Sequence, residues 1–140
     1  MSLNYQKIRD LYHSDLISFH FGLPNKKILS ALKKLDIPII TSVTNLDDAT
    51  LALNAGVDGL IAQGIEAGGH RATFDADSDY DFASSALTTL ELVRRLRPLT
   101  SLPIIAAGGI MNGADIAQAL SAGADAVQLG SAFLLCPESG

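Results

Sequence analysis

The sequence contains one cysteine, Cys136, in 140 residues. A lone thiol excludes an intrachain disulfide and a metal site built from several thiolates. Basic residues are also scarce: ten Lys and Arg stand against fifteen Asp and Glu, so the net charge is −5. Because the chain is acidic and has no basic cluster, we expect neither nucleic acid nor an anionic membrane as a partner.

Long hydrophobic runs are missing as well. No apolar stretch approaches the roughly 18 residues that a membrane-spanning helix needs, and the first residues lack the apolar core of a signal peptide. Apolar residues nevertheless make up 48% of the chain and charged residues 18%, which is the composition of a folded domain. We therefore expect a cytoplasmic protein in which residues 1–140 form a single domain.

Short apolar runs alternate with helical patterns from one end of the chain to the other. Since these runs are almost continuously apolar, they are typical of parallel strands buried on both faces of a sheet. The predicted strands are residues 16–21, 37–41, 59–63, 104–107 and 126–129. The alternation predicts an α/β protein.

Between the runs, apolar residues recur every three or four positions, as in helices with one buried face. The four stripes are Ile28, Leu32 and Leu35; Leu46, Ala49 and Leu53; Leu87, Leu90, Val93 and Leu96; and Ile116, Ala117 and Leu120. Two helix starts are predicted by a capping side chain three residues before an acid: Thr44 with Asp47, and Asn112 with Asp115. Gly56 and Gly123 are expected to end helices in the left-handed conformation.

Two segments of the chain recur. Residues 53–58 (LNAGVD) are echoed by residues 120–125 (LSAGAD), and residues 37–40 (IPII) by residues 102–105 (LPII). Repeated βα units favour a parallel (β/α) barrel of the TIM type over a doubly wound sheet, which remains the alternative. Because an eight-unit barrel takes about 250 residues, this chain has room for only part of one. A piece of a barrel, a barrel completed by a second copy, and an open sheet all fit this length.

An unusually long segment, residues 64–82, follows the predicted strand 59–63. In parallel α/β folds the carboxyl ends of the strands carry the active site, so the chemistry is expected there. The adjacent glycines Gly68 and Gly69 allow close approach to a ligand, and the next residue, His70, could exchange a proton with it. The alternative is an ordinary loop with a solvated histidine.

Two further glycine turns follow the last two predicted strands. Gly108 and Gly109 come after residues 104–107, and Gly130 and Ser131 come after residues 126–129. Main-chain N–H groups at such strand-to-helix junctions favour an anion, and in barrels the final two units commonly bind a phosphate. The alternative is a pair of tight turns that need glycine only for backbone conformation.

Other polar residues have weaker signals. The acidic residues between 75 and 81 lack the central Gly and terminal Glu of a Ca²⁺-binding loop, so a solvated segment is favoured over a metal site. His20, at the end of the strand 16–21, could line the pocket or be a core or rim histidine. Cys136 has no base beside it in sequence and is interpreted as structural.

The string QGIEAGGHR at residues 63–71, with residues 103–110, 128–133 and 18–22 (SFHFG), closely resembles the nitronate monooxygenase family. The resemblance implies an FMN-dependent TIM barrel that oxidises alkyl nitronates (nitroalkanes) with O₂ to a carbonyl compound and nitrite. It also implies that this chain corresponds to about the last five βα units of the barrel and is truncated at both ends. Exposed strand edges would then favour a homo-oligomer.

By this resemblance, His70 is the expected catalytic residue, near the nitronate and the reactive face of the flavin. The residues expected to bind FMN are Gln63, Gly68, Gly69, Gly108, Gly109, Gln128, Leu129, Gly130 and Ser131. No metal is expected. Two alternatives stay open: an FMN-dependent enoyl-thioester (enoyl-ACP) reductase, which shares the EAGGH string, and a non-catalytic barrel fragment that retains a phosphate or flavin site.

Overall fold

A single parallel sheet organises the chain. The structure, a computed structural model, describes residues 15–74, 86–134 and 136–139. The strands are β1 (Ile17–Phe19), β2 (Ile39–Val43), β3 (Gly59–Gln63), β4 (Ile104–Ala107) and β5 (Ala126–Gln128). Each strand pairs in parallel with the next one in the chain, so the order is β1-β2-β3-β4-β5. Because the order never reverses, the sheet is of the (β/α) barrel type and not doubly wound.

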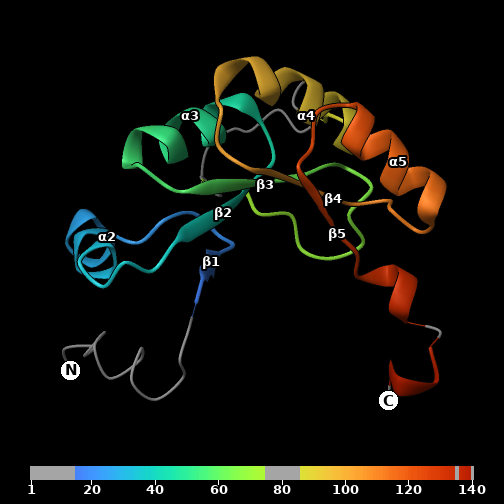
Figure 1. Ribbon diagram of the computed structural model, residues 1–140, viewed down its shortest axis with the longest axis horizontal. Coiled ribbons are helices and arrows are strands. Elements are labelled where there is room, and N and C mark those ends of the chain that lie inside the picture. The colour runs from blue at the N-terminus through green and yellow to red at the C-terminus, as the bar shows by residue number, and fades with distance from the viewer. Residues whose placement is uncertain (1–14, 75–85, 135, 140) are drawn as a thin grey trace.

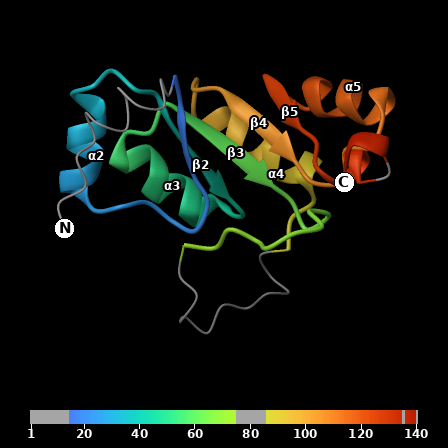
Figure 2. The ribbon, with the colours of Figure 1, turned by 90° about the horizontal axis from the view of Figure 1, so that it is seen from below.

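Helices connect successive strands on the outside of the curved sheet (Figure 1). They are α2 (Lys26–Lys33), α3 (Leu46–Ala55), α4 (Thr89–Leu96) and α5 (Gly113–Ser121), with short 3₁₀ turns at Arg97–Leu99, Ser131–Phe133 and Pro137–Ser139. The arrowheads of β3 and β4 point the same way, toward the segment that follows β3 (Figure 2). No helix within the described ranges is both long and apolar enough to span a bilayer.

The helix ends follow the predicted capping chemistry with one correction. The Asn112 side chain accepts hydrogen bonds from two N–H groups in the first turn of α5, as predicted, and Gly56 ends α3 with φ +74°. At the start of α3, however, the cap is Asn45, which accepts a 2.8 Å hydrogen bond from the Asp48 N–H. The predicted cap, Thr44, is fully buried, and its hydroxyl donates instead to the Asp48 carboxylate.

Burial is greatest in the middle of the sheet. Every residue of β2 and β3 is buried, whereas β1 and β5 contain exposed and half-buried residues. The prediction that all five strands are buried on both faces is therefore wrong for β1 and β5. Among the described residues, each of these two strands pairs with a strand on one side only, so its other side is not covered by the sheet.

The recurrent Ala-Gly-x-Asp segments have the same structural role. The Asp58 carboxylate accepts a 2.8 Å hydrogen bond from the Ile39 N–H at the start of β2. The Asp125 carboxylate accepts one of equal length from the Ile104 N–H at the start of β4, and a further one from Arg97. These aspartates therefore hold the amino ends of the strands, opposite the end where the chemistry is expected.

Candidate functional site

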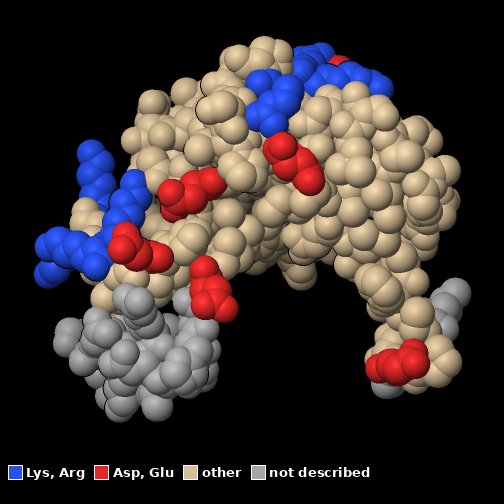
Figure 3. All heavy atoms as spheres, in the orientation of Figure 1, with Lys and Arg blue, Asp and Glu red and all other residues tan. Residues whose placement is uncertain are grey.

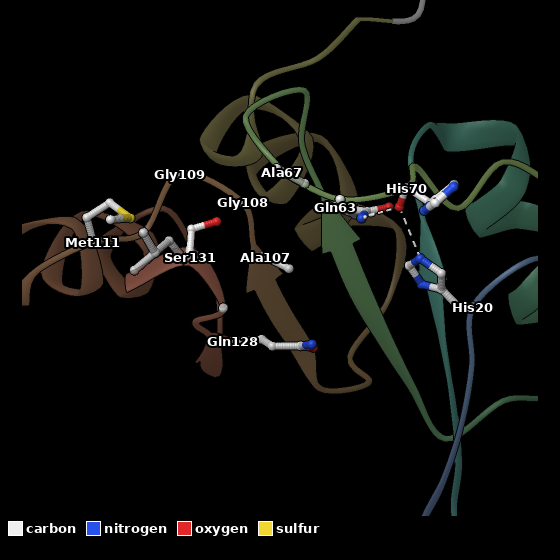
Figure 4. Close-up of a pocket in the computed structure, with 14 residues that line it drawn as sticks. His20, Gln63, Ala67, His70, Ala107, Gly108, Gly109, Met111, Gln128 and Ser131 are labelled. Atoms are coloured by element: carbon white, nitrogen blue, oxygen red, sulfur yellow. Dashed lines mark hydrogen bonds between the residues drawn. The ribbon is translucent and has the colours of Figure 1, made fainter. Parts of the chain in front are cut away.

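A cavity of about 270 Å³ lies at the carboxyl ends of the strands (Figure 4). The predicted site residues that line it are Gln63, Gly68, Gly69, His70, Gly108, Gly109, Gln128, Gly130 and Ser131. Leu129 is half-buried and packs against the hydrophobic core. The structure thus brings one loop and two glycine turns, far apart in sequence, to the same cavity.

Several lining residues were missed or left undecided from the sequence. His20, which follows β1, lines the cavity, as do Ala67, Ala107, Ile110 and Met111. Ile110 and Met111 come directly after the Gly108–Gly109 turn, and this position in the sequence could have indicated that they line the cavity. The acidic residues between 75 and 81 lie outside the described residues.

Close packing explains the glycine pair after β4. Gly108 and Gly109 have φ of +112° and +69°, which side chains disfavour. A Cβ atom on Gly108 would lie 2.9 Å from the Ala67 nitrogen, and one on Gly109 would lie 2.9 Å from the Glu66 Cβ. The turn therefore needs glycine both for its conformation and for the approach of the loop that precedes His70.

The same loop is tied to the start of α4. Glu66 Oε2 accepts hydrogen bonds from the Thr89 N–H at 2.9 Å and the Thr89 hydroxyl at 3.1 Å. The hydroxyl also lies 3.1 Å from the Ala107 carbonyl oxygen and 3.0 Å from that of Gly108. Its single proton can serve one acceptor at a time, and Thr89 is only 2% exposed. Glu66 thereby acts as a structural anchor between loop, helix and turn.

Unused hydrogen-bond donors line the cavity at the two glycine turns. Among the hydrogen bonds of the described residues, none uses the main-chain N–H of Gly109 or Gly130. A Cβ atom built on Gly69 or Gly130 meets no atom within 4 Å, so space adjoins both positions. The Gly130 N–H, which has open space beside it, and the Gly109 N–H at the same cavity suit an anionic group such as a phosphate.

The main chain at His70 is held by two side chains (Figure 4). Gln63 Nε2 donates to the His70 carbonyl oxygen at 3.1 Å, and Gln63 Oε1 accepts from the Ala72 N–H at 2.8 Å. His20 Nε2 reaches the same His70 carbonyl oxygen, also at 3.1 Å. The His70 ring is exposed and lies edge-to-face with Phe21, with ring centroids 6.2 Å apart.

Charged side chains, both basic and acidic, occupy a small part of the face of the molecule shown in Figure 3. On the face shown in Figure 3, basic side chains gather over α2 and α4, and most of the remaining visible surface is uncharged.

A buried carboxyl group, Asp48, lies at the start of α3 and is 6% exposed. Burial raises the pKa of Asp48 above its ordinary value, although hydrogen bonds from Thr44 and from the main chain of Phe74 act in the opposite direction.

The fold defines an α/β protein of the (β/α) barrel type, with a cavity lined by two glycine turns and a histidine at the carboxyl ends of its strands. The sequence profile of the family described as nitronate monooxygenase matches residues 2–140. The chain belongs to the nitronate monooxygenase family.

Curated relatives of the chain are themselves called nitronate monooxygenases. The chain is 52% identical over 124 residues to a nitronate monooxygenase of Paraburkholderia phytofirmans, covering 89% of this chain and 33% of the relative. It is 48% identical over 123 residues to a nitronate monooxygenase of Pseudomonas aeruginosa, covering 88% of this chain and 34% of that protein. The chain thus spans about a third of the length of these relatives.

Solved structures share the fold. The nitroalkane oxidase of Streptomyces ansochromogenes superimposes with a TM-score of 0.80 at 40% identity, covering 89% of this chain and 35% of that one. FabK of Thermotoga maritima superimposes with a TM-score of 0.75 at 32% identity, covering 96% of this chain and 39% of that one. In both solved structures the matched region is part of a longer chain.

Proposed function

We propose that this chain provides the FMN and substrate site of an enzyme that oxidises alkyl nitronates with O₂ to a carbonyl compound and nitrite. One observation carries the proposal: the His70 loop and the free N–H groups of two glycine turns face the same cavity. The names of the curated relatives support the nitronate as substrate class. The proposal includes a cytoplasmic location and small-molecule partners, without nucleic acid or membrane.

The described residues fit an FMN group in two parts. The N–H groups of Gly109 and Gly130, with the Ser131 hydroxyl, would hold the phosphate. Gly68 and Gly69 would allow the ring system to approach the loop after β3, because Gly69 has open space beside it. When bound, FMN would accept the electrons of the nitronate and pass them to O₂.

His70 would remove a proton from the α-carbon of a neutral nitroalkane, which gives the nitronate that is then oxidised. Its ring is exposed at the cavity and near the apolar edge of Phe21, so a small organic molecule could reach it. A positioned histidine of this kind contributes about 10²–10⁴-fold to proton transfer.

The test is to titrate the protein with FMN, record the flavin spectrum, and measure nitrite release from a neutral nitroalkane and from its nitronate. With the nitroalkane, His70→Ala is expected to lower kcat by about 10²-fold or more while FMN still binds. Wild-type turnover in His70→Ala, or failure of the wild-type protein to bind FMN, would overturn the proposal for this chain. FMN binding by the wild-type protein without turnover would favour the non-catalytic fragment that retains a flavin site.

A second candidate is the FMN-dependent reduction of an enoyl thioester. The shared EAGGH string and the likeness to FabK favour it. NADH consumption with a crotonyl thioester, without nitrite release from nitronates, would select this reaction over the first.

A further inference from the structure

Two side chains from separate strands of the sheet converge on one main-chain oxygen. The His70 carbonyl oxygen accepts from Gln63, the last residue of β3, and from His20, the residue after β1. Both donor distances are 3.1 Å, and both side chains line the cavity. Figure 4 shows them pointing to this oxygen from different elements.

The chemistry of the acceptor requires a proton on one nitrogen of the His20 ring. A carbonyl oxygen can only accept, so His20 Nε2 must have a proton. In the neutral ring, Nδ1 is then an acceptor, and the hydroxyl of Ser42 lies 3.1 Å from it. Ser42 belongs to β2 and is only 4% exposed, so its hydroxyl lies in a buried part of the sheet. The His20 ring therefore links β2 to the loop, because it contacts the Ser42 hydroxyl through Nδ1 and the His70 carbonyl oxygen through Nε2.

The His70 ring itself has little to hold it. Among the described residues, no hydrogen bond to its ring nitrogens is present, and its ring contact is with Phe21, which is 64% exposed. The position of the imidazole is thus set mainly by the main chain from which it projects. A displacement of about 1 Å at a reacting group can lower the rate about 10²-fold.

We propose that His20 is a positioning residue that, through the His70 carbonyl, fixes the place of the His70 imidazole at the cavity. Gln63 shares the same acceptor. The inference rests on the proposed role of His70 and adds to it the residue that holds that role in place.

The test compares His20→Leu, which removes the donor, with His20→Gln, which can restore one. Ser42→Ala removes the second partner of the ring and serves as an independent variant if His20→Leu does not fold. Thr41→Val is the matched control: the Thr41 hydroxyl also donates to a main-chain carbonyl across β1 and β2, that of Phe19, but Thr41 does not line the cavity.

The first measurement is the ¹H–¹⁵N ring spectrum of His70 in the protein without added ligand. We expect the His70 ring signals to shift in His20→Leu and Ser42→Ala, to return toward wild type in His20→Gln, and to stay in place in Thr41→Val. Unmoved His70 signals in both His20→Leu and Ser42→Ala would overturn the proposal. This readout is independent of turnover.

The second measurement is nitroalkane turnover with FMN. His20→Leu is expected to lower kcat about tenfold to 10²-fold with KM changed less than about threefold, and to cause no further loss when combined with His70→Ala. An equal loss in both backgrounds would show that His20 acts independently of His70 and would overturn the proposal. Wild-type turnover in His70→Ala alone would instead count against the proposed function.

Discussion

Gln63 uses both ends of its carboxamide within the chain. It donates to His70 and accepts from Ala72, so it fastens the loop that bears the proposed catalytic histidine. The resemblance alone implies a flavin contact for Gln63, and this pairing adds a second role. Sequence reasoning could not have found it, because the partners are set by how the loop folds back over β3.

Gly130 offers the sharpest residue-level test of the proposed phosphate site. Its φ is −127°, and a Cβ atom there meets nothing within 4 Å, so Gly130→Ala should change the unfolding free energy by no more than about 0.5 kcal/mol. The added methyl group would occupy space beside the free N–H, so FMN affinity is expected to fall about tenfold, by about 1.4 kcal/mol. Flavin titration of the folded variant measures this.

Gly109→Ala provides a comparison for the stability part of the Gly130→Ala prediction. With φ +69° and a Cβ only 2.9 Å from Glu66, it should lower the unfolding free energy by about 1–3 kcal/mol. Unchanged FMN affinity in Gly130→Ala would remove this turn from the proposed cofactor site.

Asp48 should make stability depend on pH in a defined direction. Its pKa is raised in the folded protein by burial, so between about 3.9, its unfolded value, and the raised value the folded state binds more protons. The unfolding free energy therefore decreases as pH rises through this window. Asp48→Asn cannot ionise, so the unfolding free energy of wild type minus that of the variant should decrease with rising pH and then level off.

Urea unfolding of both proteins at a series of pH values tests the Asp48 prediction. A difference that increases with pH would mean that the hydrogen bonds to the carboxylate outweigh its desolvation.

At the scale of elements, the apolar pattern located the strands well where burial was complete. β3 and β4 have the predicted bounds. β2 was predicted at residues 37–41 but covers Ile39–Val43. The prediction stopped before Ser42 because serine is polar, whereas in the fold its hydroxyl is paired with the His20 ring. Side-chain pairing across 22 residues is not visible to a local pattern.

The Ala-Gly-x-Asp repeat is expected to contribute to stability and not to the site. Asp125→Ala would leave the Ile104 N–H without its acceptor and Arg97 without an ion pair, so the unfolding free energy should fall by about 1–2 kcal/mol. FMN binding should be unchanged, since Asp125 lies at the amino end of β4. Denaturant unfolding and flavin titration of the same variant measure the two effects.

Glu91→Gln provides the control for Asp125→Ala. Glu91 pairs with Arg95 on the exposed face of α4, and such surface pairs contribute about 0–1 kcal/mol. A stability loss in Asp125→Ala no larger than in this variant would contradict the structural role of the repeat.

At the scale of the whole molecule, the sequence predicted the barrel-type order and the end of the sheet where the cavity lies. The repeated βα units indicated the first, and the glycine-rich loops after three strands indicated the second. Burial at the sides of the sheet was misjudged, because an apolar run does not reveal whether a strand has one neighbour or two. The outer sides of β1 and β5 pair with no strand within the described ranges.

Open strand edges are expected to make this 140-residue chain self-associate. Light scattering over a concentration series should give an average mass that rises above 14.7 kDa. Ala126→Lys, which places a charge on the exposed start of β5, should reduce this association, whereas Leu51→Lys on the exposed face of α3 should not. Constant monomer mass at all concentrations would contradict this prediction.

The separation of the two ends of the sheet has a practical consequence for probes. The 3₁₀ turn Arg97–Leu99 lies on the amino side of β4, remote from the cavity, and its Leu99 is 53% exposed. A fluorophore attached through Leu99→Cys, with Cys136 replaced by Ser, would therefore report on tumbling and surface immobilisation while leaving the ligand entrance clear.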